Sequence, residues 1–161
     1  RMCCGRISSN GIVSGAMPHT GRPFVRKRTA TCKSVTHRYQ HRTATGDMNI
    51  CVVNDTISVE ELKEIAEEFY HSMIKGAVDI EKETIAFGGE YHIDAANVLA
   101  EHGSRQESIW GFNLRFDKPR DSWLEYTALI NIKPDAGNRT MLIEDGVLRD
   151  KLKHIIGTKV V

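Results

Sequence analysis

The side chains best suited to acid–base or metal chemistry lie close together in the sequence, at Glu90, His92 and Asp94. In an extended segment all three would share one face, because side chains along a strand alternate with a period of two. Such a trio could bind a divalent metal, or His92 could serve as a general base oriented by an acid. The structural alternative is that Asp94 caps a helix, Glu90 is solvated and His92 packs at the helix entrance. No second cluster of metal-ligating residues accompanies these three side chains, so we favour the structural interpretation. We keep the three residues as candidates for catalysis.

A second polar set interrupts segments that otherwise favour strands. Asparagine is disfavoured in strand interiors, yet Asn113 and Asn131 each lie in an apolar or strand-favouring run. Their amides could hydrogen-bond loop backbone, which is the interpretation we favour. They could also line a site for an anionic or polar ligand together with a guanidinium group. The predicted ligand-binding residues are Asn113, Asn131, Asn138 and Arg139.

Familiar catalytic motifs are absent from the sequence. It contains no phosphate-binding P-loop, no Gly-x-Ser-x-Gly elbow, no His-Glu-x-x-His zinc helix and no dinucleotide fingerprint. No metal centre is predicted, and the sequence leaves the cofactor unknown. No apolar run approaches the roughly 18 residues that span a bilayer, which excludes an integral membrane protein.

The charges divide the chain into two parts. Residues 1–47 carry nine Lys and Arg and a single acid, a net charge of +8, whereas residues 48–161 carry 13 basic and 20 acidic residues, a net charge of −7. The basic part is poor in apolar residues and shows no helical or strand periodicity, so it cannot offset the entropy cost of folding. We therefore expect a disordered leader over residues 1–47 and a single domain over residues 48–161.

Three explanations of the leader remain open. It could be a transit peptide, because organelle-targeting leaders are rich in Arg and Ser and poor in acids. It could be a non-native extension, since domain-like sequence begins at Met48. It could also be a nucleic-acid-binding arm, whose densest cluster is residues 26–28. The body is too acidic to bind nucleic acid itself, so such binding would depend on this arm alone.

Three helices are predicted in the body. Ser58 and Glu61 form a capping box before a helical apolar pattern that continues to Met73. The second helix covers residues 91–102 and ends at Gly103. The third begins near Asp145 and has cationic residues near its C-terminal end.

The remaining segments read as strands. They are residues 49–53, a hairpin of 77–80 with 84–87, and residues 109–116, 123–132 and 141–143. The fold class is therefore α+β, with a mainly antiparallel sheet of about five to six strands, three helices and the order β-α-β-β-α-β-β-β-α. We expect the helices to pack on one face of the sheet and the other face to be partly open.

Three segments of the body are similar to a known family. They are VDIEKE through GGE at residues 78–90, GS through WGFN at 103–113, and INIKP through GNR at 130–139. Residues 48–156 resemble a family of short, mostly bacterial proteins known only as a domain of unknown function. Its members have a small residue and then an acid after the histidine, whereas here His92 is followed by Ile93 and Asp94. The resemblance implies a domain boundary but no activity.

These observations favour a small soluble binding module over an enzyme. We expect a small ligand or a protein partner at a polar site near residues 88–94 and 131–139. The alternative is a hydrolase-like or metal-assisted enzyme that uses His92 with Glu90 or Asp94. The expected location is cytoplasmic, or an organelle if residues 1–47 are a transit peptide. An open sheet face or edge would be compatible with a homodimer.

Overall fold

A computed structural model of the chain describes residues 37–43 and 46–161. In these residues six strands form one sheet in the order β1-β2-β4-β3-β5-β6, and every neighbouring pair is antiparallel. The strands are β1 (His37–Thr43), β2 (Gly46–Val53), β3 (Met73–Asp79), β4 (Thr84–Gly88), β5 (Ile109–Arg115) and β6 (Leu124–Glu125). The α-helices are α1 (Val59–Ala66), α2 (His92–Glu101) and α3 (Gly146–Lys159). Short 3₁₀ helices cover Gln106–Ser108, Arg120–Ser122, Leu129–Asn131 and Pro134–Ala136. The predicted α+β class is confirmed, with a mainly antiparallel sheet and three helices.

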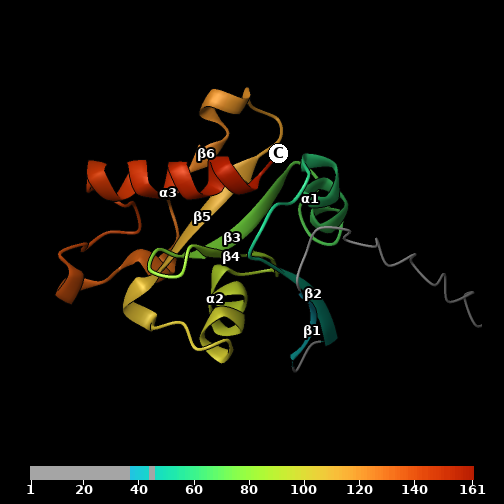
Figure 1. Cartoon of the computed structure of the whole chain (residues 1–161), viewed down its shortest axis with the longest axis horizontal. Helices are drawn as coiled ribbons and strands as arrows, with labels where there is room; N and C mark the ends of the chain where they lie inside the picture. Colours follow the sequence, from blue (N-terminus) through green and yellow to red (C-terminus); the bar gives the residue numbers. More distant parts are fainter. Residues whose placement is uncertain (1–36, 44–45) are drawn as a thin grey trace, which may run out of the picture.

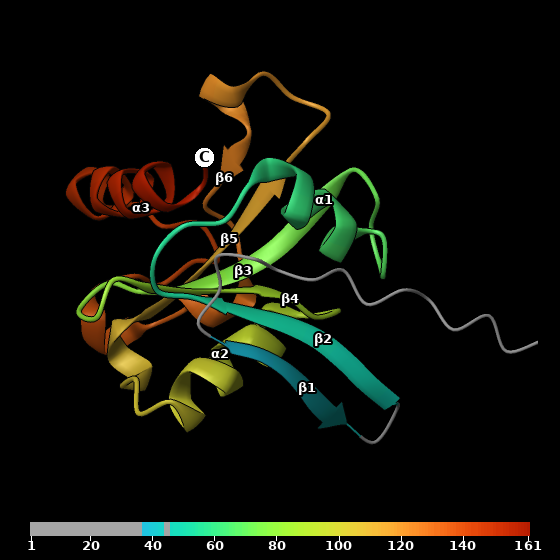
Figure 2. The same cartoon turned by 45° about the vertical axis from the view of Figure 1, so that its right-hand side comes forward.

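The expectation that the helices cover one face of the sheet is wrong, because α2 lies on the face opposite to α1 and α3 (Figure 1). Figure 2 shows α1 and α3 on one side of the sheet and α2 on the other. The strand order explains this arrangement. α1 joins β2 to β3 and α2 joins β4 to β5, and each crossover passes over one intervening strand in the same direction across the sheet. Because β2 and β4 run antiparallel, right-handed crossovers place the two helices on opposite faces.

Each face of the sheet has its own hydrophobic core. The face under α1 and α3 buries large side chains, among them Phe87 and Phe112, whose rings meet edge to face at 5.6 Å. The face under α2 is lined by small residues on both partners, including Ala77 and Ala86 on the sheet and Ala95 on the helix. Small residues on both sides let α2 lie close to the strands, so the backbone at its N-terminus is held near the sheet.

Helix α1 begins as predicted and ends earlier. The amide of Glu61 donates to Ser58 Oγ at 3.2 Å, and Ser58 N donates to the Glu61 carboxylate at 3.1 Å, so the predicted capping box is confirmed. The predicted helical pattern continued to Met73, but the helix ends at Ala66 and Met73 begins β3. A residue in the left-handed region, His71 with φ 52°, turns the chain out of the helix and towards the sheet.

The predicted strand over residues 123–132 is mostly a loop. Only Leu124 and Glu125 pair with β5, and the apolar alternation beyond them leads into the 3₁₀ helix Leu129–Asn131. The predicted strand at residues 141–143 is reduced to one bridge, between Thr127 and Leu142. Alternation predicted neither the backbone pairing here nor all of the burial, because Ile132 is 42% exposed whereas Asn131 is fully buried.

β1 extends the sheet into the segment that the charge pattern assigned to the leader. It pairs with β2 along its whole length, from His37 opposite Val52 to Thr43 opposite Gly46. The predictions for residues 1–36 and 44–45, including the cluster at 26–28, lie outside the described residues. No helix in the described part of the chain is long and apolar enough to cross a membrane.

Candidate functional site

Three segments of the chain bring polar and aromatic groups to the ammonium group of Lys75 on β3. Lys75 Nζ donates to the hydroxyl of Tyr70 at 2.6 Å and to the backbone carbonyl of Glu90 at 2.8 Å. It lies 4.4 Å from the ring centroid of Tyr70 and 5.4 Å from that of Tyr91, and both ring faces attract a cation. We call the following residues together the Lys75 site: Tyr70, Lys75, Tyr91, His92 and Asn113.

His92, the first residue of α2, joins this site to β5. Its Nε2 lies 2.9 Å from Asn113 Oδ1, and Asn113 Nδ2 donates to the carbonyl of Thr127 at 3.2 Å. Because the amide nitrogen of Asn113 faces Thr127, its oxygen accepts from His92, which places the imidazole proton on Nε2. Lys75 and Asn113 are opposite each other in the β3–β5 register, so their side chains emerge on the same face of the sheet.

The imidazole of His92 is kept neutral by its surroundings. Burial lowers the pKa of His92 below its ordinary value of 6.5, and the nearby charge of Lys75 lowers it further. Hydrogen bonds with Asn113 and with the backbone of Phe112 act in the opposite direction without reversing the shift. At neutral pH the site therefore combines one charged ammonium group with one uncharged imidazole.

Two glycines place the start of α2 beside the sheet. Gly88 and Gly89 have φ values of 108° and 87°, in the region that favours glycine. A Cβ atom on Gly88 would lie 2.5 Å from the carbonyl oxygen of Asn49, so the chain can pass β2 only without a side chain there. The predicted strand break at these glycines is present, and it sets the position of Glu90 and Tyr91.

The structure separates the two carboxylates of the Glu90, His92 and Asp94 trio from the histidine. Asp94 Oδ2 accepts the backbone N–H of Tyr91 at 2.8 Å, which matches the helix-capping alternative. Glu90 is exposed, and a hydrogen bond to its carboxylate raises the pKa of the Tyr91 hydroxyl. Within residues 37–43 and 46–161, neither carboxylate hydrogen-bonds to His92, and no three His, Cys, Asp or Glu side chains are grouped so as to hold a metal ion.

Asn131 uses its amide to complete the edge of the sheet. Its Oδ1 accepts the N–H of Gly111 at 2.7 Å, and its Nδ2 donates to the carbonyl of Gly111 at 2.9 Å, as a neighbouring strand would. The same Nδ2 lies 3.2 Å from the carbonyls of Tyr126 and Met141. With no exposed surface, Asn131 has the contacts expected of the scaffold alternative. A ligand-binding role for it stays a prediction.

Asn138 also uses its side-chain amide to bond backbone groups, in the loop that follows Asn131. Its Nδ2 lies 2.8 Å from the carbonyls of Asn131 and Thr140, and its Oδ1 accepts the N–H of Glu144 at 3.0 Å. Arg139 points to solvent, and no hydrogen bond or ion pair joins it to another residue in the described part of the chain. The side-chain amide of Asn138 therefore bonds the backbone of its own loop. Of Asn138 and Arg139, only Arg139 is accessible to a partner.

Of the four predicted ligand residues, the structure brings only Asn113 to the Glu90–Asp94 segment. Lys75 and Tyr70 are not among the site residues predicted from the sequence. The available signal was a lysine inside an otherwise apolar strand, since Lys75 lies between the buried residues Ile74 and Gly76. Nothing in the sequence pairs that lysine with Tyr70, because the contact depends on where the chain turns after α1.

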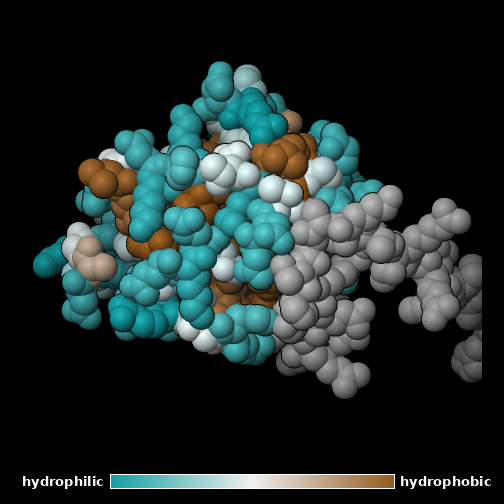
Figure 3. Space-filling model, viewed as in Figure 1, coloured by the Kyte–Doolittle hydropathy of each residue, from teal (hydrophilic) through white to brown (hydrophobic). Residues whose placement is uncertain are grey.

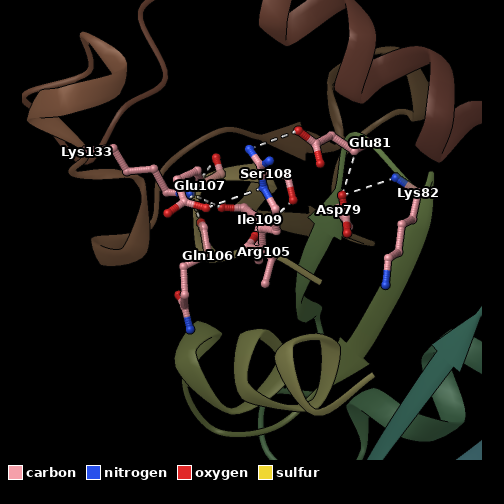
Figure 4. A network of polar contacts seen from close by, with 9 residues as sticks. All are labelled: Asp79, Glu81, Lys82, Arg105, Gln106, Glu107, Ser108, Ile109 and Lys133. Atoms are coloured by element: carbon pink, nitrogen blue, oxygen red, sulfur yellow. Dashed lines mark hydrogen bonds and ion pairs between the residues drawn. The ribbon is translucent and has the colours of Figure 1, made fainter. Parts of the chain in front are cut away.

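A second polar network anchors the loop that contains Asn131 and Asn138. Lys133 donates to the backbone carbonyls of Gln106, Glu107 and Ile109, the last at 2.5 Å, and its ammonium lies 4.7 Å from the ring centroid of Trp110. Figure 4 shows Lys133 reaching from its loop to this group of carbonyls. Burial lowers the pKa of Lys133 to about 8. All of these acceptors are backbone groups, so Lys133 connects its loop to the chain at residues 106–109.

The model of a family described as "Protein of unknown function (DUF5674)" matches residues 51–159. No curated protein matches the chain, and no solved structure does. The matched segment contains the Lys75 site and both asparagine-bonded loops. Since the match covers more than half of the sequence, the chain belongs to the DUF5674 family of proteins of unknown function.

Proposed function

We propose that this protein is a binding module and that its ligand is a small polar molecule held at the Lys75 site. The observation that supports the proposal is the hydrogen bonding of the Lys75 ammonium. It is fixed by a hydroxyl and a carbonyl, and it has three N–H donors, of which two have acceptors in the described part of the chain. A charged donor that is already oriented loses little entropy when it binds a ligand.

The neighbouring groups support the same proposal. His92 and Asn113 lie beside Lys75 in the sheet register and are oriented by their mutual hydrogen bond. Tyr91 is 58% exposed and presents its ring next to the ammonium. Together these residues offer one cation, one uncharged imidazole and an aromatic surface, a combination suited to recognition of a polar ligand.

The enzyme alternative has less support. A general-base histidine is normally oriented by a carboxylate and placed against a nucleophile. Here His92 is oriented by the Asn113 amide, and in the described residues no serine, threonine or cysteine side chain hydrogen-bonds to it. We therefore place His92 in ligand recognition and not in acid–base catalysis.

A thermal-shift screen of the full chain against metabolites and ions tests the proposal. A ligand at one hundred times its Kd should raise the free energy of unfolding by about 2.7 kcal/mol. We expect Lys75→Met to remove the shift and Lys151→Met, on the exposed surface of α3, to leave it unchanged. Stabilisation that survives in Lys75→Met but disappears in Arg139→Ala would move the site to the 131–139 loop and contradict the proposal.

A further inference from the structure

The charge of Lys75 is the starting point, because it has no anionic partner in the described part of the chain. Its two hydrogen-bond acceptors, the Tyr70 hydroxyl and the Glu90 carbonyl, are both uncharged. Two other cations of the described residues do have anionic partners: Arg115 bonds to Asp117 at 2.8 Å and Lys118 bonds to Glu125 at 2.6 Å. A cation that is oriented but not neutralised attracts an anion.

The carboxylates nearest to Lys75 in the sequence and in the strand register already bond to other groups. Glu90 directs its carboxylate to the Tyr91 hydroxyl, and Asp94 bonds to the Tyr91 amide. Glu125 lies in the same row across the sheet as Lys75 and Asn113, but its carboxylate is held by Lys118. None of the three is therefore positioned to serve as the counter-ion of Lys75.

Apolar side chains are exposed around the same site. The ring of Tyr91 is 58% exposed, Ile93 on the first turn of α2 is 43% exposed, and Leu129 is 71% exposed. Leu129 begins the 3₁₀ helix that packs against α2, two residues after the carbonyl to which Asn113 bonds. The face seen in Figure 3 is mostly hydrophilic with separate hydrophobic patches.

We propose that the ligand of the Lys75 site is an organic carboxylate with an apolar body. This inference rests on the proposed function and adds the chemical class of the ligand. The carboxylate oxygen accepts the remaining N–H of Lys75, and the apolar body covers the exposed Tyr91 ring beside it. The uncharged imidazole of His92 adds no second charge, so a single negative charge on the ligand matches the site.

Titration of the full chain with benzoate and benzamide tests the charge, because these probes share shape and differ in charge. We expect benzoate to bind at least about tenfold more tightly than benzamide, a difference of about 1.4 kcal/mol. Equal binding of the two would overturn the assignment of an anion while leaving the proposed function intact. This comparison uses only the unaltered protein, so it does not depend on whether any variant folds.

Variants and a second anion complete the test. Lys75→Met should abolish the preference for benzoate, Lys75→Arg should retain it, and Lys151→Met should behave as the unaltered chain. Inorganic phosphate should bind more weakly than benzoate, and binding as tight as that of benzoate would overturn the apolar body. If benzoate and phosphate both fail to bind at millimolar concentration, the inference is wrong, whereas a neutral ligand whose binding requires Lys75 would still support the proposed function.

Discussion

Side-chain amides replace backbone in this protein at the places where a regular strand stops. The Asn131 amide pairs with both backbone groups of Gly111, and the Asn138 amide bonds to the carbonyl of Asn131 itself. A buried backbone N–H or C=O left without a partner costs about 1–3 kcal/mol. Asparagine at these two positions therefore supplies the pairing that the loop backbone cannot provide.

Asp79 is a further buried polar residue that holds a turn. Its Oδ1 accepts the backbone N–H groups of Glu81 at 2.8 Å and Lys82 at 3.2 Å, at the turn of the β3–β4 hairpin. Burial by itself raises the pKa of Asp79, but nearby hydroxyls of Ser104 and Ser108 and the two amides outweigh it, so the pKa is lowered from 3.8. The folded state therefore binds the Asp79 proton less readily than the unfolded chain does.

We predict that Asp79 makes the stability of the fold sensitive to acid. The contribution is complete above the unfolded pKa, near 3.8, and is lost as the pH falls through the lower folded pKa. Asp79→Asn should lower the free energy of unfolding by about 1–3 kcal/mol at neutral pH and reduce its fall in acid. Urea denaturation at several pH values measures both effects. Asp135→Asn, at an exposed position, is the control, and an equal acid response in the unaltered chain and Asp79→Asn would contradict the prediction.

At the scale of elements, local signals located the boundaries that near neighbours in the sequence determine. The capping box located the start of α1, and the two glycines located the end of β4, because these residues act through contacts with their own neighbours. The end of α1 and the pairing of residues 123–132 depend on contacts distant in the sequence. In particular, the Gly111 backbone is paired by the side chain of Asn131, which no strand pattern indicates.

We predict opposite effects of alanine at two glycines in different elements. A Cβ atom on Gly111 would lie 2.5 Å from Ala128 Cβ and 2.9 Å from Ile130 Cγ1, so Gly111→Ala should cost about 1–3 kcal/mol of stability. A Cβ atom on Gly157, in α3, would meet nothing within 4 Å. Gly157→Ala should instead stabilise the fold by about 0.5–1 kcal/mol, because glycine is a poor helix residue.

Thermal or urea unfolding of the two variants against the unaltered chain measures this difference. Retained stability in Gly111→Ala would mean that the loop carrying Ala128 does not pack directly on β5. Reduced stability in Gly157→Ala would mean that the exposed surface of α3 is in contact with another part of the protein.

For the whole molecule, the arrangement depends on two crossovers that move the same way across the sheet. They place helices on both faces, so the sheet is covered where a single helical layer would have left it open. The Lys75 site lies at the start of the second crossover, where the chain leaves β4 and enters α2. Its residues come from separate segments of the sequence and meet only when both crossovers are formed.

We predict that residues 48–161 fold without the preceding segment. Buried side chains of β2, β3, β4, β5 and the three helices form both hydrophobic cores. Removal of β1 deletes the edge strand and exposes the β2 backbone, so the fragment should keep its cooperative melting and associate more than the full chain. Circular dichroism melting and sedimentation of a 48–161 fragment and a 37–161 fragment measure these effects. A 48–161 fragment without a cooperative transition would show that the domain requires the earlier residues.

The sequence by itself determined the α+β class, the three helices, the capping of α1 and the turns at glycines, because each rests on periodicity or on contacts between near neighbours. Only the tertiary structure decided which face each helix covers, which asparagines serve the backbone and which one meets His92. It also decided that Lys75, Tyr70 and Tyr91 share a site. These outcomes follow from strand order and register, which join residues far apart in the chain, and such pairings leave no local pattern in the sequence.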